Sequence, residues 1–200
     1  MRILALNQTS IAPNCDALAT DLPPLVISTP MNHYEMVALE AQNNMVENTN
    51  LVPPRANDME WTRSGEDLFV RIDPNEEIHA SLQSLADKVG FDAAAITSGI
   101  GRTRDNLYGY MNEQGVYQRR PLDPPSELVS LSGNIARKQD GSAFTHIHCC
   151  WSDDDNNVHA GHMFQSVVHV VAEIHIRILS EAIMTRCPLA DFELLGLEFS

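Results

Sequence analysis

Two alternating histidines, followed by a third after a short polar segment, have the types and the spacing of ligands for one metal ion. His146 and His148 lie in the expected strand 143–151, where successive side chains point to opposite faces, so both should project from the same face. His162 would then supply the third imidazole. Three imidazoles leave the fourth position of a tetrahedral zinc ion free for water or a ligand, which is typical of a reactive site.

The segment between these histidines predicts the turn that would bring them together. Residues 153–157 (DDDNN) have the composition of a polar hairpin turn. Gly161, beside His162, indicates a close approach of two backbones. His159 is the alternative third ligand, or a group that orients a ligand or faces the substrate. Hydrogen-bonded histidines on a half-buried sheet are the alternative interpretation without a metal.

The composition limits the classes of protein to which the chain can belong. Its 200 residues suffice for one well-packed domain with an extension. The formal net charge of -14 opposes the phosphate backbone, so nucleic-acid binding without a partner is disfavoured. The four cysteines form no CxxC motif, which favours a reduced, cytoplasmic setting. The apolar stretch at 3–6 is too short for a signal peptide, and no stretch reaches the length of a membrane span.

The pattern of the chain changes near residue 60. Residues 1–60 are rich in Asn, Pro and acidic side chains, so we expect a flexible or disordered N-terminal extension. A weakly helical window at 34–46 could dock on a partner. Residues 61–185 carry the patterns of one folded domain, and residues 186–200 would form a C-terminal tail.

The elements expected in this domain are one helix and a set of mostly short antiparallel strands. The helix should begin at Pro74, behind an Asp73 cap, and end near Val89, before Gly90. The Gly-Ile-Gly segment 99–101 should break the strand before it. The expected strands are 68–72, 91–98, 107–111, 116–119, 127–132, 143–151 and 166–179.

Glu173 lies on the polar face of the last expected strand, opposite an apolar face that runs from Val168 to Ile178 through every second residue. If this strand neighbours the histidine strand, Glu173 is the best-placed carboxylate to act as a general base or to orient water at the metal. The other polar residues of this face, His175 and Arg177, are expected to be solvated.

Four short segments, in this order and spacing, together resemble one known family. They are 127–135 (ELVSLSGNI), 146–148 (HIH), 160–163 (AGHM) and 172–174 (AEI). Their combination is similar to the PPC domain, also called PD1-like, and the resemblance covers about residues 68–179. It implies an α+β domain built on a curved antiparallel sheet with flanking helices, which assembles as a homotrimer. The implied fold is similar to that of the zinc enzyme acetolactate decarboxylase.

The resemblance also implies roles for single residues. It assigns His146, His148 and His162 as ligands of zinc or another divalent metal, and it leaves His159 outside the motif. At the position of Ala160 the family usually has a glycine. An alanine permits fewer backbone conformations shortly before His162. The family is often described as DNA-binding because its plant members carry AT-hooks, but no Arg-Gly-Arg-Pro core occurs in this chain.

Three functions therefore compete. The first is a homotrimeric metal-binding PPC protein that acts on a small anionic or carbonyl ligand, as a lyase or hydrolase with Glu173 as base. The second is a DNA-binding or transcription-associated protein with a structural metal. The third is a structural trimer whose histidines are satisfied by hydrogen bonds. We favour the first.

Overall fold

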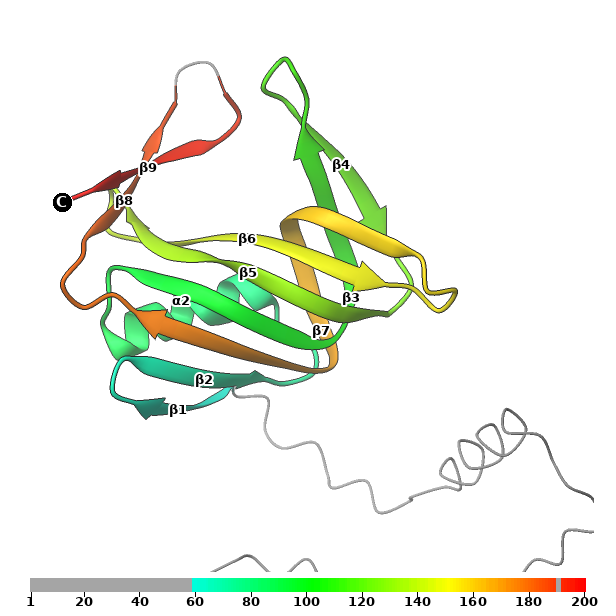
Figure 1. Ribbon diagram of the computed structural model, residues 1–200, viewed down its shortest axis with the longest axis horizontal. Helices are drawn as coiled ribbons and strands as arrows, with labels where there is room; N and C mark the ends of the chain where they lie inside the picture. The colour runs from blue at the N-terminus through cyan, green and yellow to red at the C-terminus, as the bar shows by residue number, and fades with distance from the viewer. Residues whose placement is uncertain (1–58, 190–191) are drawn as a thin grey trace, which may run out of the picture. The chain divides into compact units, whose positions relative to one another are not determined.

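The described part of the protein is mostly β-sheet with one helix. The computed structural model describes residues 59–189 and 192–200. Nine strands of this part form one sheet, and one helix lies beside it (Figure 1). The elements follow in the order β1 (Glu60–Ser64), β2 (Asp67–Ile72), α2 (Ile78–Val89), β3 (Ala94–Met111), β4 (Tyr117–Leu122), β5 (Ser126–Lys138), β6 (Ala143–Ser152), β7 (Val158–Ile178), β8 (Met184–Pro188) and β9 (Leu195–Phe199). The expected α+β class is confirmed at this level. The expected extension 1–60 and its window 34–46 lie almost entirely outside the described residues.

The two longest strands, β3 and β7, pair with each other, and each also pairs with two further strands. The order of the sheet is β1-β2-β7-β3-β5-β8-β9, while β4 pairs with β3, and β6 pairs with β5 and β7. All pairings are antiparallel except that between β5 and β8. No helix in residues 59–189 and 192–200 has the length and hydrophobicity needed to span a bilayer.

Helix α2 begins four residues later than its sequence predicts. Asn75 has a φ of 74°, a left-handed conformation that interrupts the helix expected from Pro74. Glu77 becomes the N-cap instead, because its carboxylate accepts a hydrogen bond from the Ala80 N–H at 2.7 Å. The end of the helix is as expected, with Gly90 at a φ of 80°.

Strands β3 and β7 are each longer than predicted. The expected break at 99–101 is wrong, because pairing with β7 continues through these residues, with Gly99 opposite Ile174 and Gly101 opposite Ala172. The pairing then shifts register, from Arg102↔Val171 to Thr103↔Val168. The two additional β7 residues at this irregularity turn Val170 outward, and 54% of it is exposed. The rest of the predicted apolar face of β7 is buried.

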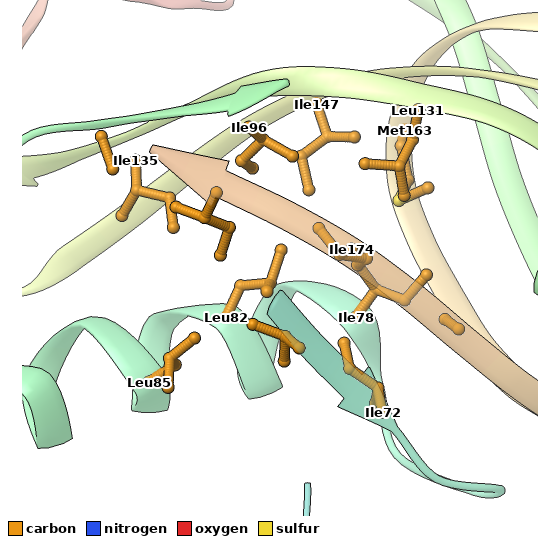
Figure 2. Close-up of a cluster of buried hydrophobic side chains, with 14 of the residues drawn as sticks. Ile72, Ile78, Leu82, Leu85, Ile96, Leu131, Ile135, Ile147, Met163 and Ile174 are labelled. Atoms are coloured by element: carbon orange, nitrogen blue, oxygen red, sulfur yellow. The ribbon is translucent and has the colours of Figure 1, made fainter. Parts of the chain in front are cut away.

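The core lies between α2 and one face of the sheet. Figure 2 shows Ile78, Leu82 and Leu85 of the helix meeting side chains of β3 and β7, including Ile96 and Ile174. All five are almost fully buried, as expected for a helix that covers a sheet. The other buried core side chains labelled in Figure 2 are Ile72, Leu131, Ile135, Ile147 and Met163.

The last residues are ordered as strands, which differs from the expected tail. β8 pairs with β9, and it also lies parallel to β5 through Arg137↔Thr185 and Lys138↔Arg186. Sequence patterns predict no strand here because the second buried position of β8 is Arg186, which interrupts the apolar alternation of a half-buried strand. This hairpin matters for function, since it brings Arg186 and residues around 192–195 beside the histidines.

Candidate metal centre

The three predicted ligands lie together on one face of two neighbouring strands. His146 and His148 are two residues apart on β6, and His148 lies directly opposite His162 of β7. Cross-strand partners share a face, so the three rings converge. Their ligand nitrogens all lie within 4.8 Å of one another, and the Nε2 atoms of His146 and His148 are 3.3 Å apart. The structure thus brings together the three histidines that the sequence singles out.

The predicted turn between β6 and β7 is confirmed and sets this register. The Asp153 carboxylate accepts hydrogen bonds from the backbone N–H groups of Asp155 at 3.0 Å and Asn157 at 2.8 Å. These bonds close the polar turn, as Asp side chains often do. The turn starts the pairing at Ser152↔Val158, and four positions later it reaches His148 and His162.

Gly161 allows β7 to approach β3 closely just before His162. A Cβ atom at this position would lie 2.4 Å from the carbonyl oxygen of Gly109, so only glycine fits without movement of a strand. Gly109 is itself paired with His162. The close approach inferred from the sequence is therefore real, and it fixes the backbone that carries the third imidazole.

His159, the alternative third ligand, lies on the other face of β7. It is the cross-strand partner of the buried Trp151. Its Nε2 atom is 2.9 Å from the Asp153 carboxylate, and its Nδ1 atom is 3.1 Å from the Tyr108 hydroxyl. The hydrogen bond from His159 is the largest cause that lowers the pKa of Asp153 to about 2. His159 therefore supports the turn and does not join the cluster.

The electrostatic setting keeps two of the clustered imidazoles neutral. Burial, and then the neighbouring Arg186 guanidinium, lower the pKa of His146 to about 4. Burial, and then the neighbouring histidines, lower the pKa of His162 to about 4. Neutral imidazoles offer the lone pairs that a metal requires. In addition, the buried Nδ1 atom of His162 has no hydrogen-bond partner within residues 59–189 and 192–200. This donor set fits a divalent cation.

The cluster opens onto a cavity of about 600 Å³. β6 pairs with β7 only from His148 to Ser152, whereas β7 pairs with β3 from His162 onward. The free end of β6, around His146, therefore borders an open space. The cavity is lined by His79, Gln83, Tyr117, Arg119, Phe144, Thr145, His146, His162, Met163, Phe164, Arg186, Pro188, Leu189, Phe192, Glu193, Leu194 and Leu195.

His79 of α2 is one of the residues that line the cavity. Gln83 donates a hydrogen bond to the Thr145 hydroxyl at 3.1 Å, and that hydroxyl lies 2.7 Å from His79 Nδ1. The other ring nitrogen of His79 lies 3.2 Å from the Met163 carbonyl oxygen, which it can reach only as an N–H donor. Burial lowers the pKa of His79. All its polar atoms are thus engaged, which marks it as a supporting group.

Aromatic and charged side chains of β4, β7 and the C-terminal segment lie around His162. The Tyr117 ring lies 4.8 Å from the His162 ring between centroids, and Phe164 lies 4.6 Å from the same ring. The Arg119 guanidinium is 4.5 Å from the centre of the Phe164 ring and forms an ion pair with Glu193. Arg119, and then the Tyr117 N–H, lower the pKa of Glu193, so this carboxylate is a poor proton acceptor.

Glu173, expected as the general base, lies elsewhere. It is eleven positions beyond His162 on the same strand (173 − 162), and each position advances a strand by about 3.3 Å. Its neighbours across the sheet are Ile100 and Arg71, and it is exposed beside a different, shallow pocket. The structure does not bring Glu173 to the histidines within one chain.

The sequence gives no signal for most of the cavity wall. Arg119, Arg186 and Glu193 stand in short strands or connections without a local motif, and His79 stands on a helix that mainly shows its apolar spacing. These residues are brought to the histidines only by the tertiary fold. Only the ligand cluster itself, encoded within a single hairpin, has a pattern that sequence reasoning can detect.

Comparisons with known proteins agree with this arrangement. The family model of the Plants and Prokaryotes Conserved (PCC) domain matches residues 59–180. A plant- and prokaryote-conserved (PPC) protein from Pyrococcus horikoshii is 28% identical, with a TM-score of 0.61 over 73% of this chain and 99% of that chain. A metal-containing protein from Archaeoglobus fulgidus is 28% identical, with a TM-score of 0.61 over 72% of this chain and 99% of that chain.

A further structural relative shares the fold at lower identity. A provisionally named DNA-binding protein from Bacteroides thetaiotaomicron is 22% identical, with a TM-score of 0.65 over 72% of this chain and 99% of that chain. At this identity the likeness shows the fold alone. No curated protein matches the chain significantly.

Proposed function

The chain belongs to the Plants and Prokaryotes Conserved (PCC) domain family, and we propose that it is a metal-binding member that also binds a small anionic ligand. His146, His148 and His162 would hold one divalent ion per chain, with zinc as the leading candidate. The observation that carries this proposal is the convergence of their nitrogens within 4.8 Å at the mouth of a cavity of about 600 Å³. A structural site would be closed, whereas two of these three imidazoles, His146 and His162, line a cavity, which leaves a position for a ligand.

The chemistry of the donor set supports this assignment. Nitrogen ligands suit zinc and several other divalent ions, so the set by itself selects a class of metal. A bound ion would act as a Lewis acid on a ligand oxygen or lower the pKa of water. The chain's own residues would orient the ligand, since Arg119, Glu193 and the aromatic wall border the same cavity. The 28% identical metal-containing protein from Archaeoglobus fulgidus adds support.

The test is the metal content of a variant that lacks one ligand. His148 is exposed, so His148→Ala should fold normally and lose stoichiometric metal. His169→Ala is the matched control, because His169 is also an exposed histidine on the neighbouring strand β7. Elemental analysis of the purified proteins should find one equivalent in the parent and the control. Full metal retention in His148→Ala would contradict the assignment.

An exposed apolar surface supports assembly of several copies, and we propose the homotrimer that the family resemblance implies. Ile100, Val129 and Val170 stand on adjacent strands and are exposed by 55%, 53% and 54%. Together with Leu128 and Val171 they border one shallow pocket. Exposed apolar side chains rimmed by charged ones, here Arg102, Glu127 and Glu173, are typical of a protein interface. Val129→Glu should lower the mass found by sedimentation, and an unchanged mass would exclude this surface from the interface.

DNA binding is the second candidate, because a structural relative carries that provisional name. The formal net charge of -14 opposes it, since duplex binding depends on clustered Lys and Arg. We therefore expect only weak unaided binding, which fluorescence anisotropy with a labelled duplex at physiological salt can measure. A submicromolar, salt-sensitive affinity would favour this candidate instead.

A further inference from the structure

Arg186 places a buried positive charge beside the proposed metal ligands. Only 5% of this residue is exposed. Its guanidinium donates to the Asn134 side-chain oxygen at 2.5 Å and to the Leu195 carbonyl oxygen at 3.0 Å, and it lies 3.3 Å from His146 Nδ1. Both oxygen acceptors are neutral. Its Nε atom is buried without any acceptor among the described residues.

No carboxylate of the described chain neutralises Arg186. Burial lowers the pKa of this guanidinium, and no acidic side chain in residues 59–189 and 192–200 opposes the effect. An arginine nevertheless stays protonated in proteins. The other arginine of the cavity differs, because Arg119 is paired with Glu193. A buried charge without a partner is costly, so the described residues of this cavity leave one positive charge that a bound anion would neutralise.

The remaining wall of the cavity is largely apolar. Phe144 lies under the Arg186 guanidinium, with the ring centre 5.6 Å away, and Phe164 and Leu195 belong to the same lining. A volume of about 600 Å³ is of the size that holds a small organic molecule. Such a wall favours a ligand with an apolar body over a small inorganic ion.

We propose that this cavity binds a small carboxylate with an apolar body, whose carboxylate is recognised by Arg186. A planar guanidinium and a carboxylate match in shape and charge, and the pair can form two parallel hydrogen bonds. A phosphate ion would need more donors than this single unneutralised cation provides. This inference deepens the proposed function and rests on it, since it names the ligand class of the cavity beside the metal.

The probe for the test is phenylacetate, measured by isothermal titration calorimetry on the full chain. Phenylacetamide has nearly the same shape without the charge, and inorganic phosphate has the charge without the apolar body. We expect phenylacetate to bind about tenfold to a hundredfold more tightly than phenylacetamide, as is typical for charge-assisted hydrogen bonds. Phosphate should bind more weakly than phenylacetate.

Two variants distinguish a specific contact with Arg186 from a general effect of the protein's net charge. Arg186→Met should weaken phenylacetate binding by the same tenfold to hundredfold factor, about the value for a lost charged hydrogen bond. Arg177→Met is the matched control, because Arg177 is an exposed arginine that pairs with Asp67 away from the cavity. It removes the same net charge and should leave the affinity unchanged. If Arg186→Met fails to fold, Arg186→Lys keeps the charge and loses the planar fork, so the affinity should still fall.

The outcomes distinguish this inference from the metal assignment. Metal content is measured on each sample first, and absence of metal in the parent protein would refute the proposed function. Phenylacetate affinity is then measured with and without zinc. Equal affinity for phenylacetate and phenylacetamide, tighter binding of phosphate, or parental affinity in a folded Arg186 variant would overturn the carboxylate proposal, even where zinc is bound.

Discussion

Gly161→Ala tests how the backbone positions the proposed metal ligands. The added Cβ would lie 2.4 Å from the Gly109 carbonyl oxygen, whereas real Cβ atoms keep at least 3.0 Å, so the strands must separate by at least 0.6 Å (3.0 − 2.4). Gly109 is paired with His162, the next residue, so the displacement acts directly on the third imidazole. Metal to ligand distances tolerate only about 0.2 Å. The substitution should therefore weaken the metal site more than the fold.

The expected magnitudes can be checked separately. Overpacking of this kind costs about 1–3 kcal/mol of unfolding free energy, which for a domain of this size lowers the Tm by about 3–10 °C. Zinc affinity, measured by competition with a coloured chelator, should fall by at least about tenfold. Ala160→Ser is the control, since Ala160 is exposed and adjacent. Parental zinc affinity in Gly161→Ala would refute the reasoning.

Three further outcomes are expected. Without zinc, the Tm should fall as the pH drops from 6.5 to about 4, because unfolded histidines bind protons near pH 6.5 while His146 and His162 have folded pKa values of about 4. Above pH 6.5 both histidines are neutral in the folded and unfolded chains, so this loss of stability is absent there. Replacing both with Gln should make the Tm depend less on pH between 6.5 and about 4. Thr103→Val should cost about 1–3 kcal/mol in urea unfolding, because the buried Trp151 Nε1 loses its acceptor at 2.9 Å, while Thr103→Ser should be milder. Deletion of residues 1–58 should leave Tm, metal content and oligomer size unchanged, since the family match begins at residue 59; monomers in sedimentation would contradict this.

The histidine cluster was predictable because its determinants are local. The alternation of His146 and His148 follows from strand geometry, and the acidic turn then fixes the pairing partner of His148. Gly161 could be interpreted for the same reason, as a close approach one residue before His162. Helix α2 was also predictable, although its start shifted because Asn75 adopts a left-handed conformation that the spacing of apolar residues does not reveal.

The cavity was not predictable because its wall is assembled from distant segments. Glu173 was chosen on the assumption that its strand neighbours the histidines, but β7 is one long strand that pairs with β6 at its start and with β2 near its end. The first half carries His162, and the second half carries Glu173. Arg186 reaches the site through a parallel pairing of β8 with β5, which no local pattern announces.

The hairpin of β6 and β7 also has a consequence for the order in which the protein assembles. The first and third of the proposed ligands are separated by 16 positions (162 − 146), so closing this loop costs little chain entropy. By contrast, Arg186 and His79 join the site only through contacts of long sequence separation, which generally form later in folding. We therefore expect the β6–β7 hairpin to bind the proposed ion during folding before the cavity beside it has formed. The bound ion would then stabilise the hairpin early in folding, whereas the carboxylate would bind only to the fully folded domain.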